Sequence, residues 1–195
     1  MELTRSYSGK TVLVTGHTGF KGSWLSTWLQ NMGAEVHGVA LDPPSSPSHY
    51  DVASIGGVLQ DHRIDLQDED AIVQLIKDLQ PDFVFHLAAQ SLVRSSYESP
   101  LDTMMINAIG SATILEALRG LRKSVVAIMI TSDKAYDNVE WAWGYRETDR
   151  LGGKDPYSAS KAMAELAIRS YVESYFSAPN SNVRIGITRA GNVIG

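Results

Sequence analysis

Short apolar runs alternate along the chain with longer stretches in which apolar residues recur every three or four positions. The short runs are rich in β-branched residues and lack the polar alternation of a strand with one face in water. This pattern predicts strands that are buried on both faces of a parallel sheet. The predicted strands are residues 10–15, 35–41, 58–64, 83–89, 124–131 and 183–189.

Helical periodicity fills most of the connections between these strands. The predicted helices are residues 23–32, 67–79, 100–119 and 155–176. Parallel strands need crossover connections of this kind, and such crossovers are right-handed. We therefore expect one α/β domain, residues 1–195, with a Rossmann-type doubly wound parallel sheet in three layers.

Composition and charge narrow the class of protein. With 195 residues, 44% hydrophobic and 20% charged, the chain is long enough for one globular domain. A net charge of -5 argues against a general attraction for nucleic acid or for an anionic membrane. Cysteine is absent and no signal peptide is evident, so we expect a cytoplasmic protein without disulfides. The five histidines lack HxxxH and HExxH spacing, and no metal site is expected.

The sequence Gly16-His-Thr-Gly-Phe-Lys-Gly22 lies between the first predicted strand and the first predicted helix. In that setting the glycines allow a tight turn, close approach of the backbone to a pyrophosphate, and close packing of the helix on the strand. The N-terminal N–H groups of the helix then face the anion. Three glycines at this spacing also occur in ordinary turns, and it is the flanking strand and helix that favour a phosphate-binding loop.

Asp42 follows the second predicted strand, where dinucleotide-binding folds place a carboxylate on the adenosine ribose. An Asp at a strand end is also a common loop residue, and its spacing after the glycine loop favours the ribose role. A carboxylate there repels a 2'-phosphate and favours NAD over NADP, whereas Lys21 favours the phosphate. We give Asp42 the greater weight. The segment 42–49, rich in Pro and Ser, is predicted to be a loop beside the adenosine.

Tyr157 and Lys161 open the helix that follows an aromatic and charged loop, residues 136–154. Their spacing places the phenol and the ammonium on one face of the helix. A phenol of pKa about 10 is a poor base at neutral pH, but a neighbouring ammonium and an oxidised nicotinamide favour the phenolate. The spacing alone also fits a surface pair on an ordinary helix. Thr131 and Ser132, at a strand end where ligands bind in open α/β sheets, favour catalysis.

Longer motifs connect these parts to a known family. The glycine loop, His86-Leu-Ala-Ala89, Asn107 and the Tyr157/Lys161 pair resemble the extended short-chain dehydrogenase/reductases over nearly the whole chain. Within that superfamily, several longer strings resemble the CDP-glucose 4,6-dehydratases. These strings are GHTGFKGSWL, LDPPS, HLAAQSLVRSSY, TSDKAY, EWAWGYRE, GGKDPYSASKAMAE and RAGNVIG.

The resemblance implies which residues hold the cofactor NAD and the nucleotide-sugar substrate. For NAD it implies Gly16, Thr18, Gly19, Phe20, Lys21, Gly22, Asp42, Asp65, Leu66, Leu87, Ala88, Ala89, Asn107, Thr131, Tyr157 and Lys161. For the substrate it implies Gln90, Arg94, Ser132 and Asn192.

The implied reaction converts CDP-D-glucose to CDP-4-keto-6-deoxy-D-glucose in deoxysugar biosynthesis. Carbon C4 is oxidised by tightly bound NAD, water is lost across C5 and C6, and the hydride returns to C6. The resemblance makes Tyr157 the base for the C4 hydroxyl. Lys161 would hold the nicotinamide ribose and lower the pKa of Tyr157, and Ser132 would form a hydrogen bond near O4.

Two further catalytic roles follow from the resemblance. Asp133 would protonate the departing C6 hydroxyl, which requires a carboxyl that its site keeps protonated. Lys134 stands where related dTDP-glucose dehydratases carry a Glu that removes the C5 proton, and a lysine can do this only if burial or a nearby cation lowers its pKa. Without the family motifs, Asp133 and Lys134 would simply be a surface ion pair.

The resemblance also implies a longer chain and a partner. Family members continue past the GNVIG segment into a smaller carboxyl-terminal lobe that grips nucleotide and sugar, so we expect residues 1–195 to be a truncated cofactor-binding domain. A homodimer through the Asn107 helix and the Tyr/Lys helix is implied as well. Two alternatives stay open: a nucleotide-sugar 4-epimerase, which loses no water, and an NAD-binding fragment without turnover.

Overall fold

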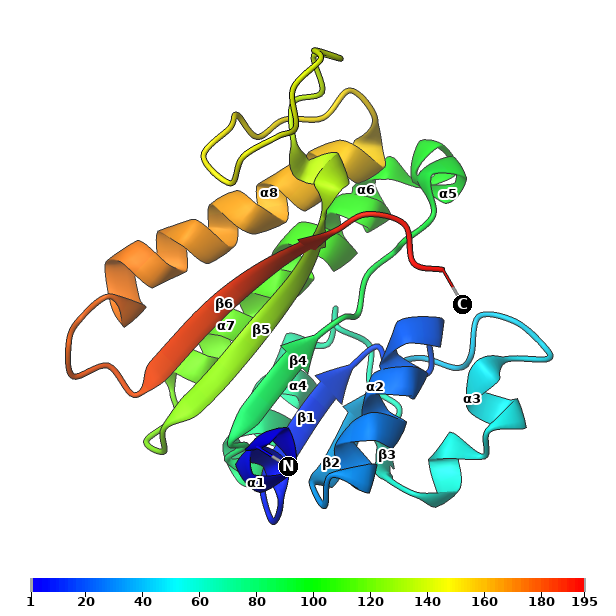
Figure 1. The fold of residues 1–195 in the computed structure, drawn as a ribbon, viewed down its shortest axis with the longest axis vertical. Coiled ribbons are helices and arrows are strands. Elements are labelled where there is room, and N and C mark those ends of the chain that lie inside the picture. Colours follow the sequence, from blue (N-terminus) through cyan, green and yellow to red (C-terminus); the bar gives the residue numbers. More distant parts are fainter. Residues whose placement is uncertain (1, 195) are drawn as a thin grey trace.

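A six-stranded parallel sheet forms the centre of the molecule (Figure 1). The structure is a computed structural model that describes residues 2–194. The strand order is β3-β2-β1-β4-β5-β6, which is that of the doubly wound Rossmann fold and confirms the predicted fold class. The strands are β1 (Thr11–Thr15), β2 (Glu35–Val39), β3 (Gln60–His62), β4 (Phe83–His86), β5 (Val125–Ser132) and β6 (Val183–Ala190).

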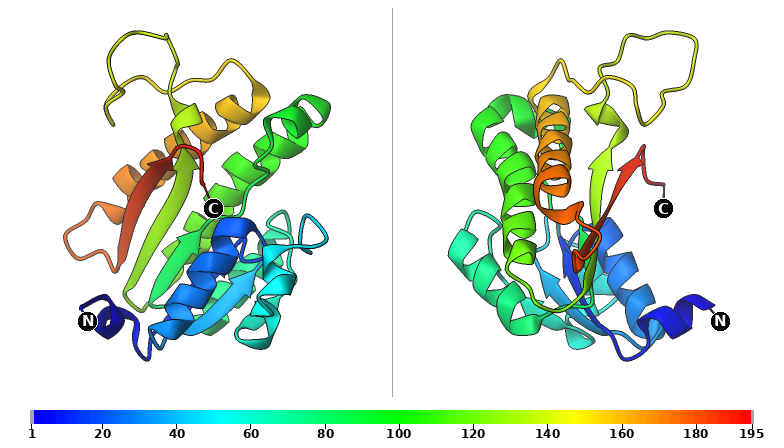
Figure 2. Two further views of the ribbon diagram at one scale, coloured as in Figure 1. Left: turned by 45° about the vertical axis from the view of Figure 1, so that its right-hand side comes forward. Right: turned by 90° about the vertical axis from the view of Figure 1, so that its left-hand side faces the viewer.

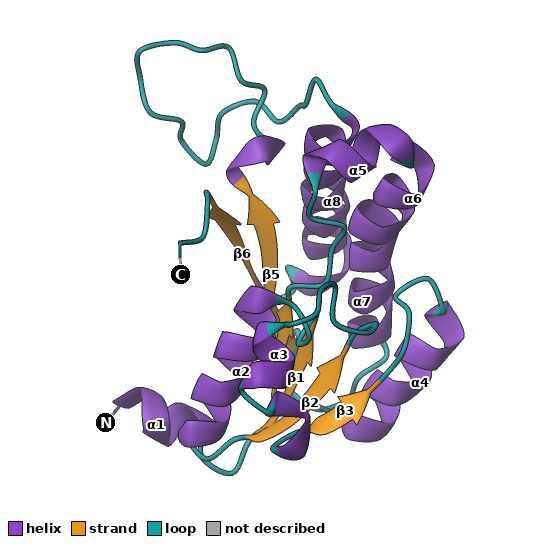
Figure 3. Cartoon of the chain, turned by 90° about the vertical axis from the view of Figure 1, so that its right-hand side faces the viewer, coloured by secondary structure: helices purple, strands orange, loops and turns teal. Residues whose placement is uncertain are grey.

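Helices cover the sheet unequally. They are α1 (Glu2–Tyr7), α2 (Phe20–Asn31), α3 (His49–Val52), α4 (Glu69–Leu79), α5 (Val93–Glu98), α6 (Pro100–Met104), α7 (Gly110–Arg119) and α8 (Pro156–Tyr171). Helices α4, α7 and α8 pack on one face, and α1 and α2 lie on the other (Figures 2 and 3). Over residues 2–194, no helix covers the second face of β5 and β6 (Figure 3). None of the helices in this part of the chain is long and apolar enough to cross a membrane.

Side chains of β1 enter both layers of the core. Leu13 packs in the larger cluster with residues of α4, α7 and α8, such as Ile76, Leu118 and Ile168. Val12 and Val14 point to the opposite face and pack with Leu29 of α2. Successive strand residues face opposite sides of a sheet. This double burial explains why the strand reads as a continuous apolar run rather than an alternating one.

The strand ends differ from the predicted ones where the chain enters loops. Strand β2 ends at Val39 instead of residue 41, β4 ends at His86 instead of residue 89, and β3 is only Gln60–His62. Most of the apolar residues that extended the predictions line a cleft beyond the strand ends: Ala40, Leu41, Ile64, Leu87, Ala88 and Ala89. Apolar patterning indicates that a residue is buried, but it does not distinguish burial in a strand from burial in a loop.

Two predicted helices contain π-helical turns. The helix predicted over residues 100–119 is α6, a π-helical segment Met105–Ile109 and α7, and the helix over residues 155–176 ends in a second such segment, Val172–Phe176. These wider turns often lie at functional sites. The short helices α1, α3 and α5 were not predicted, because a helix of four to six residues gives little periodic signal.

Candidate active site

A cleft of about 490 Å³ lies at the carboxyl ends of β1, β2 and β4. Strand β1 is flanked by β2 and by β4, so the strand order reverses here, and open α/β sheets bind ligands at this point. The cleft is lined by many of the residues that were predicted to hold the cofactor and by one predicted for the substrate. They are Gly16, Thr18, Gly19, Phe20, Lys21, Gly22, Asp42, Asp65, Leu66, Leu87, Ala88, Ala89 and Gln90.

The glycine loop has no room for a side chain at Gly16 or at Gly22. Gly16 has φ +76°, and a Cβ on it would lie 2.8 Å from the backbone N of Ala88. A Cβ on Gly22 would lie 2.1 Å from the carbonyl oxygen of Gly16. Helix α2 begins at Phe20 with no acidic residue in its first turn, so its free N–H groups face the cleft without a competing carboxylate. The loop therefore fits the pyrophosphate of a dinucleotide.

A neutral histidine joins the strands that flank the cleft. His86 is fully buried, and its ring nitrogens form hydrogen bonds with Thr15 Oγ1 at 2.8 Å and Ser111 Oγ at 3.1 Å. Burial lowers the pKa of His86 to about 3, so the ring is uncharged at neutral pH. Thr15 Oγ1 also accepts a hydrogen bond from the backbone N of Ala88 at 3.1 Å. This network holds the end of β4 against the end of β1.

Asn107 is buried in the π-helical segment and does not line the cleft. Its Oδ1 accepts a hydrogen bond from the backbone N of Gln90 at 2.8 Å, and its Nδ2 donates to the carbonyl oxygen of Gln90 at 3.0 Å and to Ser160 Oγ at 2.8 Å. All the polar groups of this amide are thus engaged in holding the Gln90 loop against α8. Direct cofactor contact by Asn107 stays a prediction.

Helix α8 presents Tyr157 and Lys161 from a well-capped first turn. Asp155 caps the helix by accepting a hydrogen bond from the backbone N of Ser158 at 2.9 Å, and Pro156 occupies the first helical position. The backbone N of Tyr157 donates to Ser96 Oγ of α5 at 3.1 Å. Lys161 Nζ lies 5.9 Å from the centroid of the Tyr157 ring, so the two predicted catalytic side chains are adjacent.

Burial controls the ionisation of both groups. It raises the pKa of Tyr157, an effect that the Ser132 hydroxyl opposes, and it lowers the pKa of Lys161 to about 8. Burial is the largest effect on the pKa of Tyr157 in this structure, and the lowering of that pKa by Lys161 beside an oxidised nicotinamide stays a prediction. The positive charge of Lys21 in the glycine loop also lowers the pKa of Lys161.

Ser132, Asp133 and Lys134 lie at the carboxyl end of β5. Ser132 Oγ donates to Asp133 Oδ1 at 3.1 Å and accepts from the backbone N of Lys134 at 3.2 Å. Asp133 and Lys134 are exposed, and no ion pair joins them in the described chain. The burial that would prepare Lys134 for a role as a base is thus not present, and the roles of both residues stay predictions.

A buried carboxylate below Lys161 was not predicted. Glu165 accepts a hydrogen bond from Thr131 Oγ1 at 2.6 Å and from Arg189 Nε at 2.7 Å. Arg189 also donates to the carbonyl oxygen of Glu147 at 3.1 Å, and its guanidinium lies 4.6 Å from the centroid of the Tyr136 ring. The spacing of Tyr157, Lys161 and Glu165, four residues each, is a signal by which the sequence could have revealed this position.

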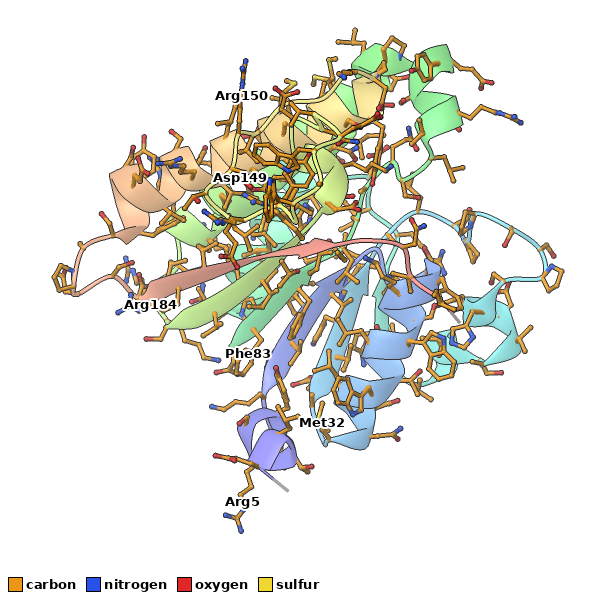
Figure 4. All side chains as sticks on the ribbon, turned by 45° about the horizontal axis from the view of Figure 1, so that its top comes forward. Arg5, Met32, Phe83, Asp149, Arg150 and Arg184 are labelled. Carbon is orange, nitrogen blue, oxygen red and sulfur yellow. The ribbon has the colours of Figure 1, made fainter. Side chains whose placement is uncertain are left out.

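The remaining predicted substrate residues lie apart from the cleft. Arg94 is exposed on α5, and Asn192 is exposed in the segment that follows β6. The aromatic loop, residues 136–154, projects beyond the sheet and includes stacked Tyr136 and Tyr145 rings (Figure 1). In Figure 4 the side chain of Arg150 in this loop points outward; it forms an exposed ion pair with Asp137 at 3.5 Å.

Known proteins are similar to this chain in sequence and in fold. CDP-glucose 4,6-dehydratase of Salmonella typhimurium is 46% identical over 192 residues, which are 97% of this chain and 54% of that protein. An epimerase of Methanothermobacter thermautotrophicus superposes with a TM-score of 0.80 at 26% identity, over 97% of this chain and 53% of that one. UDP-glucose 4-epimerase of Brucella ovis, solved with NAD, gives 0.77 at 25% identity, over 94% and 52%.

The extent of these matches defines the family. The chain spans about half the length of the relatives that it matches. The family model of GDP-mannose 4,6 dehydratase matches residues 13–185, from β1 into β6. That range contains the glycine loop, every lining residue of the cleft except Val193, and the Tyr157/Lys161 pair. The chain belongs to the GDP-mannose 4,6 dehydratase family.

Proposed function

We propose that this chain carries the cofactor site and the acid–base residues of an NAD-dependent CDP-glucose 4,6-dehydratase. The observation that carries the proposal is a buried Tyr157/Lys161 pair beside a dinucleotide cleft, in a chain 46% identical to a CDP-glucose 4,6-dehydratase. The substrate would be a nucleotide-sugar, CDP-glucose, and the product its 4-keto-6-deoxy form. The reaction loses one water and leaves the cofactor in its starting oxidation state.

The cofactor fits the observed cleft. The glycine loop would hold the pyrophosphate, and Asp42 and Asp65 would border the adenosine. The related epimerase of Brucella ovis was solved with NAD. When bound, NAD supplies the acceptor and then the donor of the hydride. The residues of this chain position the sugar and move the protons.

Proton transfer at C4 is assigned to Tyr157. Its raised pKa makes the neutral phenol the resting form, so Tyr157 must lose its own proton before it can accept one from the C4 hydroxyl. Lys161, with a pKa of about 8, is mostly protonated at neutral pH, and its positive charge favours that loss. Ser132 would hold the oxygen at C4. Asp133 would give a proton to the departing C6 hydroxyl, and Lys134 would take the C5 proton.

The first test measures product mass. We expect a protein with the length of its relatives to convert CDP-glucose, in the presence of NAD, to a product lighter by one water, without net formation of NADH. An unchanged mass with an inverted C4 would instead establish a 4-epimerase, the activity that the name of the Brucella ovis neighbour states. Binding of NAD without turnover by residues 1–195, with turnover restored at full length, would show that this chain is the cofactor-binding part.

We also propose that the protein is a homodimer through α6, α7 and α8. Helices α6 and α8 pack side by side (Figure 3). Exposed apolar side chains lie on α6, on the π-helical segment that follows it and on α8. These are Leu101, Met105, Ile109, Met163 and Leu166. The first three are spaced by four residues and form one stripe, which a second copy can cover by two-fold symmetry.

Charges on this stripe should separate the subunits. We expect Leu101→Glu/Leu166→Glu to change the sedimenting species from dimer to monomer, because each carboxylate would be buried unpaired in the interface. Val52→Glu on α3 is the matched control, since Val52 is equally apolar and is 75% exposed outside the proposed interface. A monomeric wild type, or the same change in the control, would contradict the dimer.

A further inference from the structure

A cation that no sequence motif marks lies next to residues that line the adenosine end of the cleft, although Arg63 is not itself a lining residue. Arg63 follows β3, and its Nη1 donates to the carbonyl oxygen of Leu41 at 3.0 Å and to Asp42 Oδ1 at 3.1 Å. Leu41 and Asp42 both line the cleft. The Asp42 carboxylate, which was predicted to contact the adenosine ribose, is therefore already paired with the guanidinium of Arg63.

Arg63 keeps its position through contacts that do not involve Asp42. Its Nε and Nη2 donate to Asp61 Oδ2 at 3.1 and 2.7 Å. Asp61 is held in turn by the Nε2 of His17, at 3.0 Å, and by the hydroxyl of Tyr50. The guanidinium also lies 5.2 Å from the centroid of the Tyr50 ring. The orientation of Arg63 is thus fixed from the side of β3 and the glycine loop.

Asp42 is held far more weakly than Arg63. The side chain of Asp42 is 95% exposed, whereas that of Arg63 is 36% exposed. Within the described residues, the contact with Arg63 is the ion pair that Asp42 makes. Removing the Asp42 carboxylate would therefore free one N–H group of Nη1, while the hydrogen bond from Nη1 to the carbonyl oxygen of Leu41 and the contacts with Asp61 keep the guanidinium in place. Guanidinium groups bind phosphates with charge-assisted hydrogen bonds.

We propose that Asp42 and Arg63 act together as the selectivity element of the cofactor site, in which Asp42 accepts the ribose hydroxyls and masks Arg63 from a 2'-phosphate. This inference rests on the proposed binding of NAD. It assigns to Arg63 a latent site for the 2'-phosphate of NADP. Asp42 then favours NAD over NADP in two ways. It binds the ribose hydroxyls of NAD, and it occupies the guanidinium donor that the 2'-phosphate of NADP would use.

The test is a double-mutant cycle read by calorimetric titration with NAD and with NADP. We expect Asp42→Ala to weaken NAD about tenfold and to strengthen NADP about tenfold, the size of one lost or gained hydrogen bond to a charged group. In Asp42→Ala/Arg63→Ala the gain for NADP should vanish. Arg63→Lys on the Asp42→Ala background should keep part of it, because the charge remains without the planar fork.

The control and the contradicting outcomes are distinct. Arg150→Ala removes an exposed arginine of the aromatic loop and should change neither affinity. No gain of NADP affinity in Asp42→Ala, or a gain that survives the loss of Arg63, would overturn the assignment of Arg63 while NAD binding stands. If wild type binds neither dinucleotide, the cofactor assignment itself fails, and this inference fails with it.

Discussion

Tyr157→Phe should lower the turnover of CDP-glucose by about 10²- to 10⁴-fold, the range for removing a positioned acid–base group. The phenyl ring keeps the packing of a side chain that is buried on α8, so the fold and the binding of NAD should be retained. The measurement is kcat in a protein with the length of its relatives, together with NAD titration of the same preparation. A loss of kcat with unchanged NAD affinity would place Tyr157 at the reacting sugar rather than in the scaffold.

Tyr171→Phe is the matched control on the same helix. Its hydroxyl donates to Glu116 Oε2 at 3.1 Å, away from the cleft. The substitution therefore removes one hydrogen-bonded phenol from α8 without touching the proposed site. An equal loss of turnover in both variants, or turnover by Tyr157→Phe within a few-fold of wild type, would contradict the acid–base role.

Glu165→Ala should lower the free energy of unfolding by about 3–5 kcal/mol, the cost of breaking one partner of a buried ion pair. Glu165 is 2% exposed and pairs with Arg189, whose pKa its carboxylate raises. Without it the guanidinium is left in a largely buried place, and Thr131 loses an acceptor. Equilibrium urea unfolding of the 195-residue chain measures the effect as a lower midpoint.

An exposed ion pair near the C-terminal end of α8 serves as the control for the buried Glu165–Arg189 pair. Glu173 accepts from Arg169 at 2.8 Å, and both side chains are well exposed. Glu173→Ala should cost much less than Glu165→Ala, because exposed ion pairs contribute little to stability. Glu165→Gln keeps the shape of the side chain and should cost less than Glu165→Ala, which leaves a measurable variant if the alanine protein does not fold. Equal midpoints for Glu165→Ala and Glu173→Ala would exclude a stabilising role for the buried pair.

The sheet and the cleft were largely predictable from sequence because their signals are local. A buried parallel strand such as β1 is one apolar run, and the glycine loop lies within seven residues between that strand and α2. Both features depend on neighbours in the sequence. The fold class and the glycine loop were therefore within reach of a single sequence. Lining residues such as Asp65 and Ala88 were named only through the family resemblance, and the ends of β2 and β4 were not predicted.

What the sequence did not reveal depends on pairs of distant residues. Arg63 and Asp42 are 21 positions apart, and Thr131 and Glu165 are 34 apart. A charged residue reads as a solvated surface residue until its partner is known. The raised pKa of Tyr157 could not be predicted for the same reason, since it results from burial by surrounding elements. The π-helical turn at Asn107 has no apolar period of its own.

The place of β1 in the sheet also sets the order in which the cleft can assemble. Thr15 and His86, which join β1 to β4, are 71 positions apart, whereas β2 follows β1 after one helix. During synthesis the ribosome releases the glycine loop long before the strand that forms the other wall of its cleft. Closing so long a loop is slow, and a ligand that binds only the folded state adds its stabilisation after that step. The glycine loop is therefore synthesised early, but its binding cleft is complete only after β4 has paired with β1.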